Sequence, residues 1–327
     1  MTTSYILEIK NLRTHFYTEK GLVTAVDGVT LDVGKGEMLG LLGESGCGKS
    51  VTMQSVMRLL DNVKYEGEIL FKDRNLLSIR NEEMRKIRGN SISMVFQDPM
   101  SSFNPVYTIG KQIIEGINIH KKQPYKEAYS ESVEMLKLVG LSEPAKRMKQ
   151  YPFELSGGMR QRVLIAMGLM LQPDLLIADE PTSALDVTTQ AQILDLINEI
   201  KDKFNMATIM ITHDLGVIAE VCTRVAVMYL GQIIEEADVN TLFDNPLHPY
   251  TVGLMESIPS INYARSKKLP VIKGMVPSLF NIPRGCRFVT RCSYCDKLCE
   301  EQEPDVKVLP GNHKVKCWHF EKIFSRG

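Results

Sequence analysis

The residues best suited to chemistry in this chain form a glycine-rich loop between positions 43 and 50. The loop reads GESGCGKS and fits the spacing G-x4-G-K-[ST] in full. Glycines at these places let the backbone curl so that successive N–H groups point inward and cradle phosphate oxygens. Lys49 can reach the terminal phosphates, and Ser50 offers a hydroxyl to Mg²⁺. The loop therefore predicts a site for a nucleoside phosphate, in an ATPase, a GTPase or a small-molecule kinase.

Polar side chains also stand at the ends of three apolar runs further along the chain. Asp179 and Glu180 close the run LLIADE, His213 follows ATIMIT, and Gln97 follows ISMVF. A carboxylate at a strand end can hold Mg²⁺, and a second one beside it can act as a general base. Such an acidic pair can equally cap the following helix, and a single histidine at a strand end is more often structural. Residue type alone leaves these roles open.

Five segments closely resemble, in order and spacing, the elements that ABC ATPases carry beyond the phosphate loop. They are FQDP (96–99), LSGGMRQR (155–162), LLIADEP (175–181), SALD (183–186) and THD (212–214). In the family these are the Q-loop, the signature loop, the Walker B strand, the D-loop and the switch histidine. The combination is far more specific than the phosphate loop alone.

The resemblance implies a role for each residue. Glu180 would be the general base for the attacking water, and His213 would sense the γ-phosphate. Mg²⁺ would be held by Ser50, Gln97 and Asp179, and Gln97 would couple the site to a helical subdomain. The loop residues implied to contact ATP are Gly43, Glu44, Ser45, Gly46, Cys47, Gly48, Lys49, Ser50 and Val51.

The signature loop implies that two ATPase chains work together. In the family, the residues at Ser156, Gly157 and Gly158 cap the γ-phosphate held by the opposite subunit, using a hydroxyl, backbone N–H groups and a helix N-terminus. Asp186 is the implied D-loop residue. Met159 stands where many members carry glutamine, which leaves the phosphate-facing atoms in place. ATP would then join the dimer, and a monomer should hydrolyse it poorly.

The family also uses an aromatic residue upstream of the phosphate loop to contact adenine. Its distance ahead of Gly21 makes Phe16 the predicted residue, with Tyr17 as the alternative. A purely structural aromatic is the competing interpretation of Phe16.

Three features resemble the ATPases of oligopeptide and dipeptide importers in particular. DVTTQAQIL (186–194) matches the stretch after their D-loop, and HPYT (248–251) followed by SIP (257–259) matches the start of their C-terminal extension. The third feature is a cysteine-rich segment near the C-terminus. Dipeptide, oligopeptide and nickel import are not separable from these residues.

The cysteines gather towards the C-terminus, since only Cys47 and Cys222 of the seven stand alone. Four follow the spacing C-x5-C-x6-C-x17-C of that extension: Cys286, Cys292, Cys299 and Cys317. Four thiolates in a loop-rich segment suit a [4Fe–4S] cluster, with Zn²⁺ and with disulfides or free thiols as alternatives. Cys295 is extra to the pattern, as a spare thiol or an alternative ligand. The expected role is structural, because a segment with so few apolar residues needs a bound metal group or a cross-link to hold its fold.

The hydrophobic pattern predicts the elements that position these residues. The segments 5–12 and 23–33 predict an antiparallel hairpin or meander. Residues 187–202 have helical spacing, and the stretch 101–172 predicts an inserted helical subdomain. Strands of a buried parallel sheet are predicted at 38–42, 92–96, 175–179, 207–212 and 224–229.

The predicted fold is therefore α/β: a P-loop (RecA-like) ATPase core with an antiparallel β subdomain, an inserted helical subdomain and a loop-rich extension. We place the main boundary near residue 240, because prolines and then cysteines become frequent beyond it. This predicts an ABC ATPase domain at 1–240 and the extension at 241–327.

Composition limits the partners. Lys plus Arg and Asp plus Glu each number 39, so no excess positive charge favours nucleic acid. No apolar run approaches the ~18 residues of a membrane helix, and the start of the chain lacks the pattern of a signal peptide. We expect a chain on the cytoplasmic face of the membrane, attached there through two permease subunits. The resemblance implies a second, homologous ATPase in a heterodimer and, indirectly, an extracytoplasmic solute-binding protein.

Two other classes of ABC protein usually carry features that differ from this sequence. A soluble ABC ATPase acting on DNA or the ribosome usually carries a coiled-coil insertion or a second cassette, and neither is visible in the sequence. An exporter usually fuses its own membrane helices to the ATPase. The alternative that stays open is the ATPase of an importer for nickel or another solute.

Overall fold

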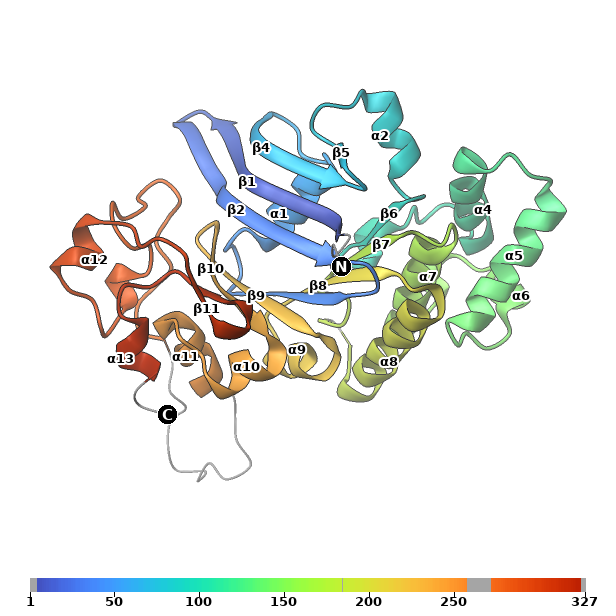
Figure 1. The fold of residues 1–327 in the computed structure, drawn as a ribbon. Helices are drawn as coiled ribbons and strands as arrows, with labels where there is room; N and C mark the ends of the chain where they lie inside the picture. The colour runs from blue at the N-terminus through green and yellow to red at the C-terminus, as the bar shows by residue number, and fades with distance from the viewer. Residues whose placement is uncertain (1–4, 184, 258–271, 325–327) are drawn as a thin grey trace. The chain divides into compact units, whose positions relative to one another are not determined.

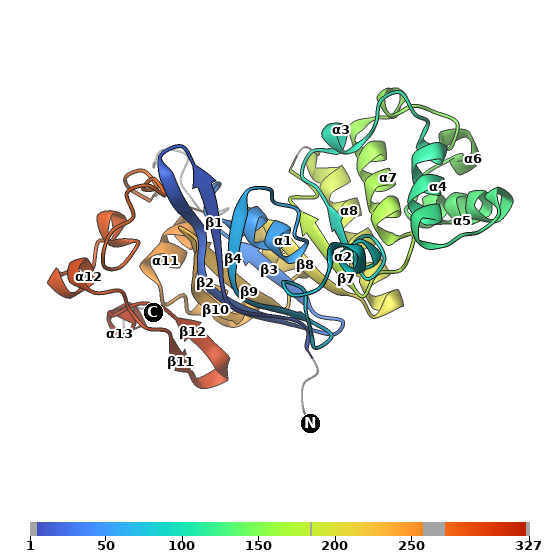
Figure 2. The ribbon, with the colours of Figure 1, turned by 90° about the horizontal axis from the view of Figure 1, so that it is seen from above.

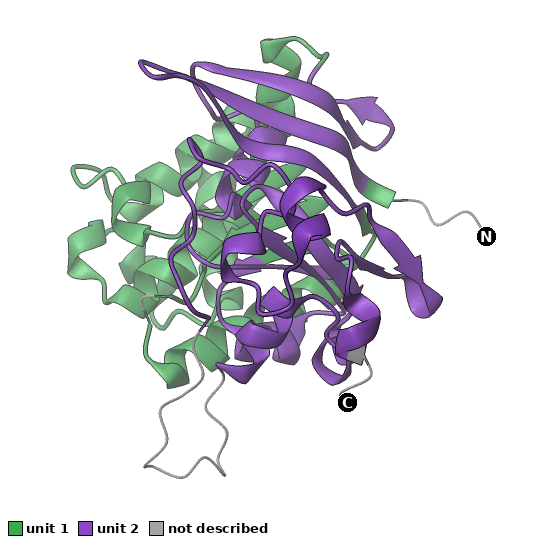
Figure 3. Cartoon of the chain, turned by 90° about the vertical axis from the view of Figure 1, so that its left-hand side faces the viewer, with its two compact units in different colours: residues 1–6, 33–37, 78–210 green, residues 7–32, 38–77, 211–327 purple. Residues whose placement is uncertain are grey.

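The computed structural model describes residues 5–183, 185–257 and 272–324. Its contacts divide the chain into two compact units, which Figure 3 colours separately. Unit 1 comprises residues 1–6, 33–37 and 78–210, and unit 2 comprises residues 7–32, 38–77 and 211–327. The boundary predicted near residue 240 falls inside unit 2, and the division into domains 1–240 and 241–327 stays a prediction.

An antiparallel sheet, most of it in unit 2, holds the N-terminal strands in the order β2-β1-β4-β5. The strands are β1 (Tyr5–Thr18), β2 (Gly21–Gly34), β4 (Val63–Phe71) and β5 (Arg74–Asn75). The register of β1 against β4 shifts between Lys10 and Arg13. Gly67 of β4 lies opposite this shift with φ +90°, and a Cβ there would collide with the carbonyl oxygen of Lys10. A glycine is therefore required at this irregularity.

Five further strands of unit 2 lie in the order β11-β12-β10-β9-β3. They are β3 (Met38–Leu42), β9 (Arg224–Tyr229), β10 (Gln232–Asp238), β11 (Lys307–Leu309) and β12 (His313–Val315). Every residue of β3 is buried, as its continuous apolar run predicts. β3 and β9 are parallel, whereas β9, β10, β12 and β11 pair antiparallel. The sheet predicted as parallel is therefore mixed, and its antiparallel edge comes from the C-terminal part of the chain.

The helices of unit 2 are short. They are α1 (Lys49–Val56), α9 (Leu215–Val221), α10 (Val239–Asp244), α11 (Pro249–Glu256), α12 (Lys297–Glu301) and α13 (Phe320–Phe324), with 3₁₀ turns η2 (Val289–Arg291) and η3 (Pro310–Asn312). The C-terminal region is loop-rich, as predicted, and Figure 1 shows it in orange and red from α10 to α13. The part of the SIP motif at Ile258 and Pro259 lies outside the described residues.

Unit 1 contains the parallel strands β6 (Ile92–Val95) and β7 (Leu175–Asp179), and β8 (Ala207–Thr212) begins in it. The stretch between β6 and β7, described in full, forms helices and no strand, as predicted for the helical insertion. Figure 2 shows α4, α5 and α6 grouped beside α7. The helices of the unit are α2 (Asn81–Ile87), α3 (Pro99–Ser102), α4 (Ile109–His120), α5 (Tyr125–Leu138), α6 (Pro144–Arg147), α7 (Gly157–Leu169) and α8 (Val187–Phe204), with η1 (Pro152–Glu154) before α7.

Local sequence explains where the long helix α8 begins and ends. The side chain of Asp186 accepts the N–H of Thr189 at 3.0 Å and so caps its N-terminus. At the other end Asn205 has the left-handed φ of +49° that terminates a helix. Among the described residues, no helix combines the length and the apolar character needed to cross a membrane.

Candidate active site

The phosphate loop joins β3 to α1 in unit 2 and has the backbone that its glycines predict. Gly43, Gly46 and Gly48 have φ values of +156°, +78° and +107°. A Cβ on Gly43 would collide with the carbonyl oxygen of Met228, and one on Gly48 would lie 2.9 Å from that of Ala25. Only glycine combines this conformation with this close packing. The loop can therefore turn its amide groups inward at the N-terminus of α1.

Lys49 and Cys47 complete the loop. The Lys49 ammonium donates to the carbonyl oxygens of Gly43 at 2.6 Å and Glu44 at 3.0 Å, and the residue is 5% exposed. Burial raises the pKa of the Cys47 thiol, which makes it a packed, neutral side chain. The Lys49 ammonium is thus held within the loop by its own backbone, and Cys47 supports the shape of the loop.

Two residues from the C-terminal region of the same unit contact Glu44 in the loop. The sequence did not predict these contacts. Its carboxylate accepts two hydrogen bonds from the Arg291 guanidinium, at 2.6 and 3.1 Å. Its backbone N–H donates to the Tyr250 hydroxyl at 2.8 Å. The hydrogen bonds that Arg291 donates to Glu44 raise the pKa of Arg291, which is permanently charged. No local pattern announces a partner 247 residues away.

His213 and Phe16 also belong to unit 2. His213 is exposed directly after β8, and Asp214 beside it caps α9 by accepting the N–H of Gly216 at 2.8 Å. Phe16 is half-buried on β1 opposite Val63 of β4, whereas Tyr17 is 55% exposed. The adenine contact assigned to Phe16 stays a prediction.

The acidic pair lies in unit 1 at the end of β7. Asp179 is 5% exposed, and Glu180 has the left-handed φ of +46°. The Gln97 side chain donates its amide N–H to the Glu180 carboxylate at 2.8 Å. The alternative in which the pair caps the next helix is not supported, because the cap of α8 is Asp186. An unusual backbone that aims a partnered carboxylate is typical of a functional residue.

The signature and D-loop motifs of unit 1 contain the N-caps of α7 and α8, Ser156 and Asp186. Ser156 and Gly157 are exposed, and the Ser156 hydroxyl accepts the N–H of Met159 at 3.3 Å to cap α7. A Cβ on Gly158 would lie 2.8 Å from a methyl carbon of Thr189, the residue bonded to Asp186. The two N-caps, Ser156 and Asp186, therefore lie on neighbouring helices, and both residues are exposed.

The cysteines predicted as ligands lie near one another in unit 2, and all seven cysteines of the chain are free thiols. The backbone N–H of Cys286 donates to the carbonyl oxygen of Cys299 at 2.8 Å. Burial raises the pKa of Cys292 to about 11 and that of Cys317 to about 12, and the charges of neighbouring cysteines add to both shifts. Disulfides, one of the alternatives, are absent from this segment, whereas the exposed Cys295 lies close enough to affect Cys292 and Cys299 electrostatically.

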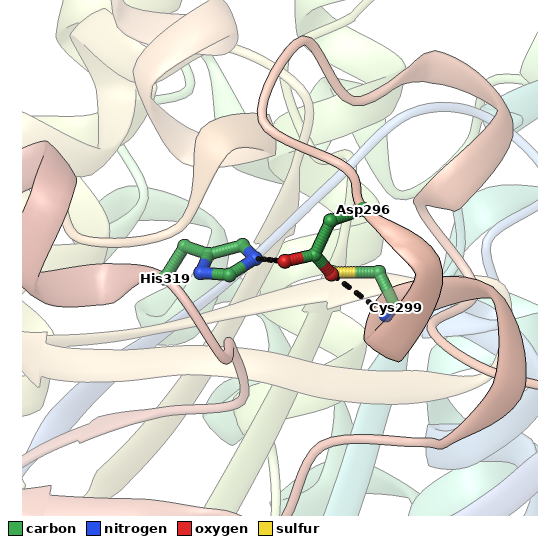
Figure 4. A group of neighbouring side chains, drawn as sticks. All are labelled: Asp296, Cys299 and His319. Atoms are coloured by element: carbon green, nitrogen blue, oxygen red, sulfur yellow. Dashed lines mark hydrogen bonds and ion pairs between the residues drawn. The ribbon is translucent and has the colours of Figure 1, made fainter.

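Two further ligand types stand beside this cluster and were missed from the sequence. Figure 4 shows Asp296, Cys299 and His319, whose ligand atoms all lie within 4.8 Å of one another. The His319 ring nitrogen Nε2 is 2.8 Å from the Asp296 carboxylate, which also accepts the N–H of Cys299 at 3.2 Å. The only signal in the sequence is that each lies two or three residues from a predicted ligand.

Comparison with known proteins decides the family. A model described as "ABC transporter" matches residues 26–183, and one described as "Oligopeptide/dipeptide transporter, C-terminal region" matches residues 234–299. The probable peptide ABC transporter ATP-binding protein y4tR of Sinorhizobium fredii is 49% identical over 98% of this chain and 96% of its own length. The chain belongs to the ATP-binding proteins of peptide ABC transporters. The oligopeptide transport ATP-binding protein AppD of Bacillus subtilis is 48% identical over 98% of both chains.

Solved structures of ABC cassettes agree with this family. The cassette MJ0796, in a dimeric post-hydrolysis state bound to ADP and phosphate, is 27% identical with a TM-score of 0.65. It covers 71% of this chain and 98% of its own length. The resemblance to ABC ATPases, the P-loop α/β fold and the ATPase activity are thereby confirmed.

Proposed function

We propose that this ABC ATPase binds MgATP on the loop Gly43–Ser50 and hydrolyses it with Glu180 as the general base. The observation that carries the proposal is the hydrogen bond from Gln97 to the Glu180 carboxylate, 2.8 Å long. It orients the carboxylate to take the proton from a water whose oxygen attacks the γ-phosphorus. The bond from γ-phosphorus to the bridging oxygen breaks, and ADP and phosphate leave.

The residues that we propose hold Mg²⁺ have the donor atoms that this ion prefers. The Asp179 carboxylate, the Ser50 hydroxyl and the Gln97 side-chain oxygen are all hard oxygen ligands. When bound, the ion neutralises charge on the phosphate oxygens. Lys49 would move from the loop carbonyls to the β- and γ-phosphates, and His213 would hydrogen-bond the γ-phosphate. Val51 and the remaining loop residues would contribute backbone N–H groups.

The binding half of the proposal is tested with Lys49→Ala. Removing the only ammonium within the loop should weaken binding of a fluorescent ATP analogue by at least about tenfold. Lys307→Ala, an exposed lysine of β11 in the same unit, is the matched control. Equal affinities for the two variants would remove the loop from the ATP site.

We infer further that Ser156, Gly157 and Gly158 act on ATP bound by a second, homologous ATPase, with Asp186 beside them. This is supported by the exposure of Ser156, Gly157 and Asp186 and by the places of Ser156 and Asp186 at the N-termini of α7 and α8. The dimeric cassette MJ0796 is the solved precedent for two chains of this fold together.

The cargo follows from the family's extension. We propose that the chain powers import of dipeptides or oligopeptides through two permease subunits, from the cytoplasmic face of the membrane and with a solute-binding protein outside. The match of residues 234–299 to the oligopeptide/dipeptide C-terminal region supports this choice over a nickel importer. Uptake of labelled peptides should stop in cells whose copy carries Lys49→Ala. Loss of nickel uptake with peptide uptake intact would assign the other cargo.

The cysteine cluster fits a [4Fe–4S] group, which we propose is held by Cys286, Cys292, Cys299 and Cys317. Their thiols affect one another electrostatically, and those of Cys292 and Cys317 accept backbone N–H groups at 3.4 Å, as cluster sulfurs commonly do. The group would staple a segment with few apolar residues. Zn²⁺ is the alternative, and Asp296 and His319 supply ligand types that suit it.

The cluster is tested on protein purified without oxygen. Broad visible absorption near ~400 nm with about four irons and four sulfides per chain would support the cluster. About one zinc per chain and no iron would replace it by the zinc site. If the protein contained neither iron nor zinc, the cysteines would be free thiols.

A further inference from the structure

Glu44 is the one acidic residue of the phosphate loop, and three groups hold it from different sides. The Arg291 guanidinium binds its carboxylate through two hydrogen bonds, at 2.6 and 3.1 Å. The Tyr250 hydroxyl accepts its backbone N–H at 2.8 Å, and Lys49 donates to its carbonyl oxygen at 3.0 Å. Two of the three partners come from residues beyond 240, so the C-terminal region reaches directly into the loop.

Contacts with residues other than Glu44 also hold the Arg291 side chain in place. Its side chain is 3% exposed, its guanidinium carbon lies 5.8 Å from the ring centroids of both Tyr229 and Phe288, and its Nε donates to the carbonyl oxygen of Lys273 at 3.1 Å. Tyr250 packs against the same rings, at 4.8 Å from Tyr229 and 5.6 Å from Phe288. Both groups that grip Glu44 therefore stand on one aromatic cluster.

A second arginine ties this segment to the strands behind the loop. Arg287 donates to the carbonyl oxygen of Leu230 and forms an ion pair with Asp27. Gly231, which follows Leu230 in the chain, donates its N–H to the carbonyl oxygen of Cys47 at 2.8 Å. Arg287 thus bonds the segment 287–291 to Asp27 of β2 and to the turn between β9 and β10, and that turn is hydrogen-bonded to the phosphate loop.

We propose that Arg291 and Tyr250 are positioning residues for ATP, acting through Glu44. Arg291 neutralises a carboxylate that would otherwise repel the incoming triphosphate, and Tyr250 fixes the backbone of the loop at the same residue. This inference rests on the proposed binding of ATP by Gly43–Ser50. The C-terminal extension is then part of the nucleotide site and not only an appended module.

The proposed role of Arg291 is electrostatic, so a second substitution that removes the charge of Glu44 should compensate for the loss of the guanidinium. A loop that binds a polyanion through N–H groups and one lysine is weakened by a free negative charge within it. Arg291→Met keeps the bulk of the side chain and removes its charge, which leaves the Glu44 carboxylate uncompensated. In a Glu44→Gln background the same substitution leaves no unpaired charge behind. A purely structural role for Arg291 would weaken binding equally in both backgrounds.

The experiment measures the Kd of the full chain for a fluorescent ATP analogue with Mg²⁺. Arg291→Met should weaken binding on the order of tenfold, the effect of one uncompensated charge near a bound anion. Arg291→Lys should stay within about threefold of wild type, since it retains the charge but not the bidentate geometry. Arg284→Met, an exposed arginine of the same segment, is the matched control. In the Glu44→Gln background the effect of Arg291→Met should shrink to less than about threefold.

Three outcomes distinguish the positioning role of Arg291 from the binding of ATP by the loop. Binding by wild type that Lys49→Ala weakens, together with the predicted loss and its suppression by Glu44→Gln, supports the positioning role. The same Lys49 dependence with Arg291→Met equal to Arg284→Met, or with a loss that Glu44→Gln does not reduce, overturns it and leaves the ATP site intact. An affinity that Lys49→Ala does not change overturns the proposed ATP site itself.

Discussion

At the scale of single residues, the buried ring of His248 has a structural role in the C-terminal region. His248, within the motif HPYT, is a helix cap: its Nδ1 accepts the N–H of Tyr250 at 3.0 Å. Burial lowers the pKa of its ring from 6.5 to about 3. The imidazole is therefore neutral in the folded chain at every pH above that value, which suits an acceptor and not a titrating ligand.

This pKa makes the stability depend on pH. Because the unfolded chain binds a proton on His248 below pH 6.5 and the folded chain does not until about pH 3, stability is lost on acidification through that window. Between pH 7 and pH 5 this residue alone should lower the free energy of unfolding by about 2 kcal/mol. Urea unfolding should show that His248→Asn, which retains an acceptor, loses this share of the pH dependence. His120→Asn, at the end of α4, should keep it, and equal pH profiles for the two variants would contradict the assignment.

Some residues of the active site could be predicted from a local motif, whereas others depend on contacts between distant parts of the chain. The spacing GESGCGKS predicted the phosphate loop, because the backbone there follows from its own glycines. The pairing of Gln97 with Glu180, 83 residues apart, and the grip of Arg291 on Glu44 could not be predicted. Such contacts depend on which strand ends meet, and no local pattern contains that information.

At the scale of elements, the strands that are apolar throughout were predictable and those with buried charge were not. β3, β7, β8 and β9 begin and end where their apolar runs do. β10 was missed because Glu235 and Glu236 interrupt its pattern, although each is 1% exposed. Glu236 is neutralised by Arg224 at 2.5 Å and Lys314 at 3.0 Å, which are 12 and 78 residues away. A glutamate in the sequence predicts an exposed position, and only its charged partners in the structure explain why it can be buried.

Glu235 should be the side chain that docks the C-terminal elements onto β10. Its carboxylate accepts the N–H groups of Leu247 at 2.6 Å and His248 at 2.9 Å, and His313 of β12 lies 2.8 Å from it. Glu235→Ala leaves these buried donors without a partner and should lower the free energy of unfolding by about 3 kcal/mol. Glu256→Ala, an exposed residue of α11, should change it by less than about 0.5 kcal/mol. A urea midpoint that Glu235→Ala leaves unchanged would contradict this docking.

At the scale of the whole molecule, the proposed function assigns this chain to work with a second ATPase chain. Its charge is balanced, its signature loop is exposed, and its described residues contain no membrane-spanning helix. The family assignment supplies the context, since the peptide transporter relatives match along nearly the full chain. The energy of ATP would therefore be used between chains, through surfaces that are exposed in one copy.

Action of the signature loop on a second chain predicts complementation between two inactive variants. Ser156→Arg blocks the loop but leaves the chain's own ATP site intact, and Lys49→Ala does the reverse. Mixed pairs contain one complete site, so an equimolar mixture should recover about a quarter of wild-type turnover if copies pair at random. The double variant mixed with wild type controls for simple dilution. A mixture as inactive as its components would mean that two copies of this chain do not complete each other's sites.

The measurement that tests the central claim most directly is ATP turnover by Glu180→Gln with bound nucleotide determined in the same samples. The amide keeps the size of the side chain and its bond to Gln97 but takes no proton. Hydrolysis should fall at least about 100-fold while ATP binding stays near that of wild type, as expected when a general base is removed. Turnover equal to wild type would contradict the assignment of Glu180, and with it the mechanism proposed for this ATPase.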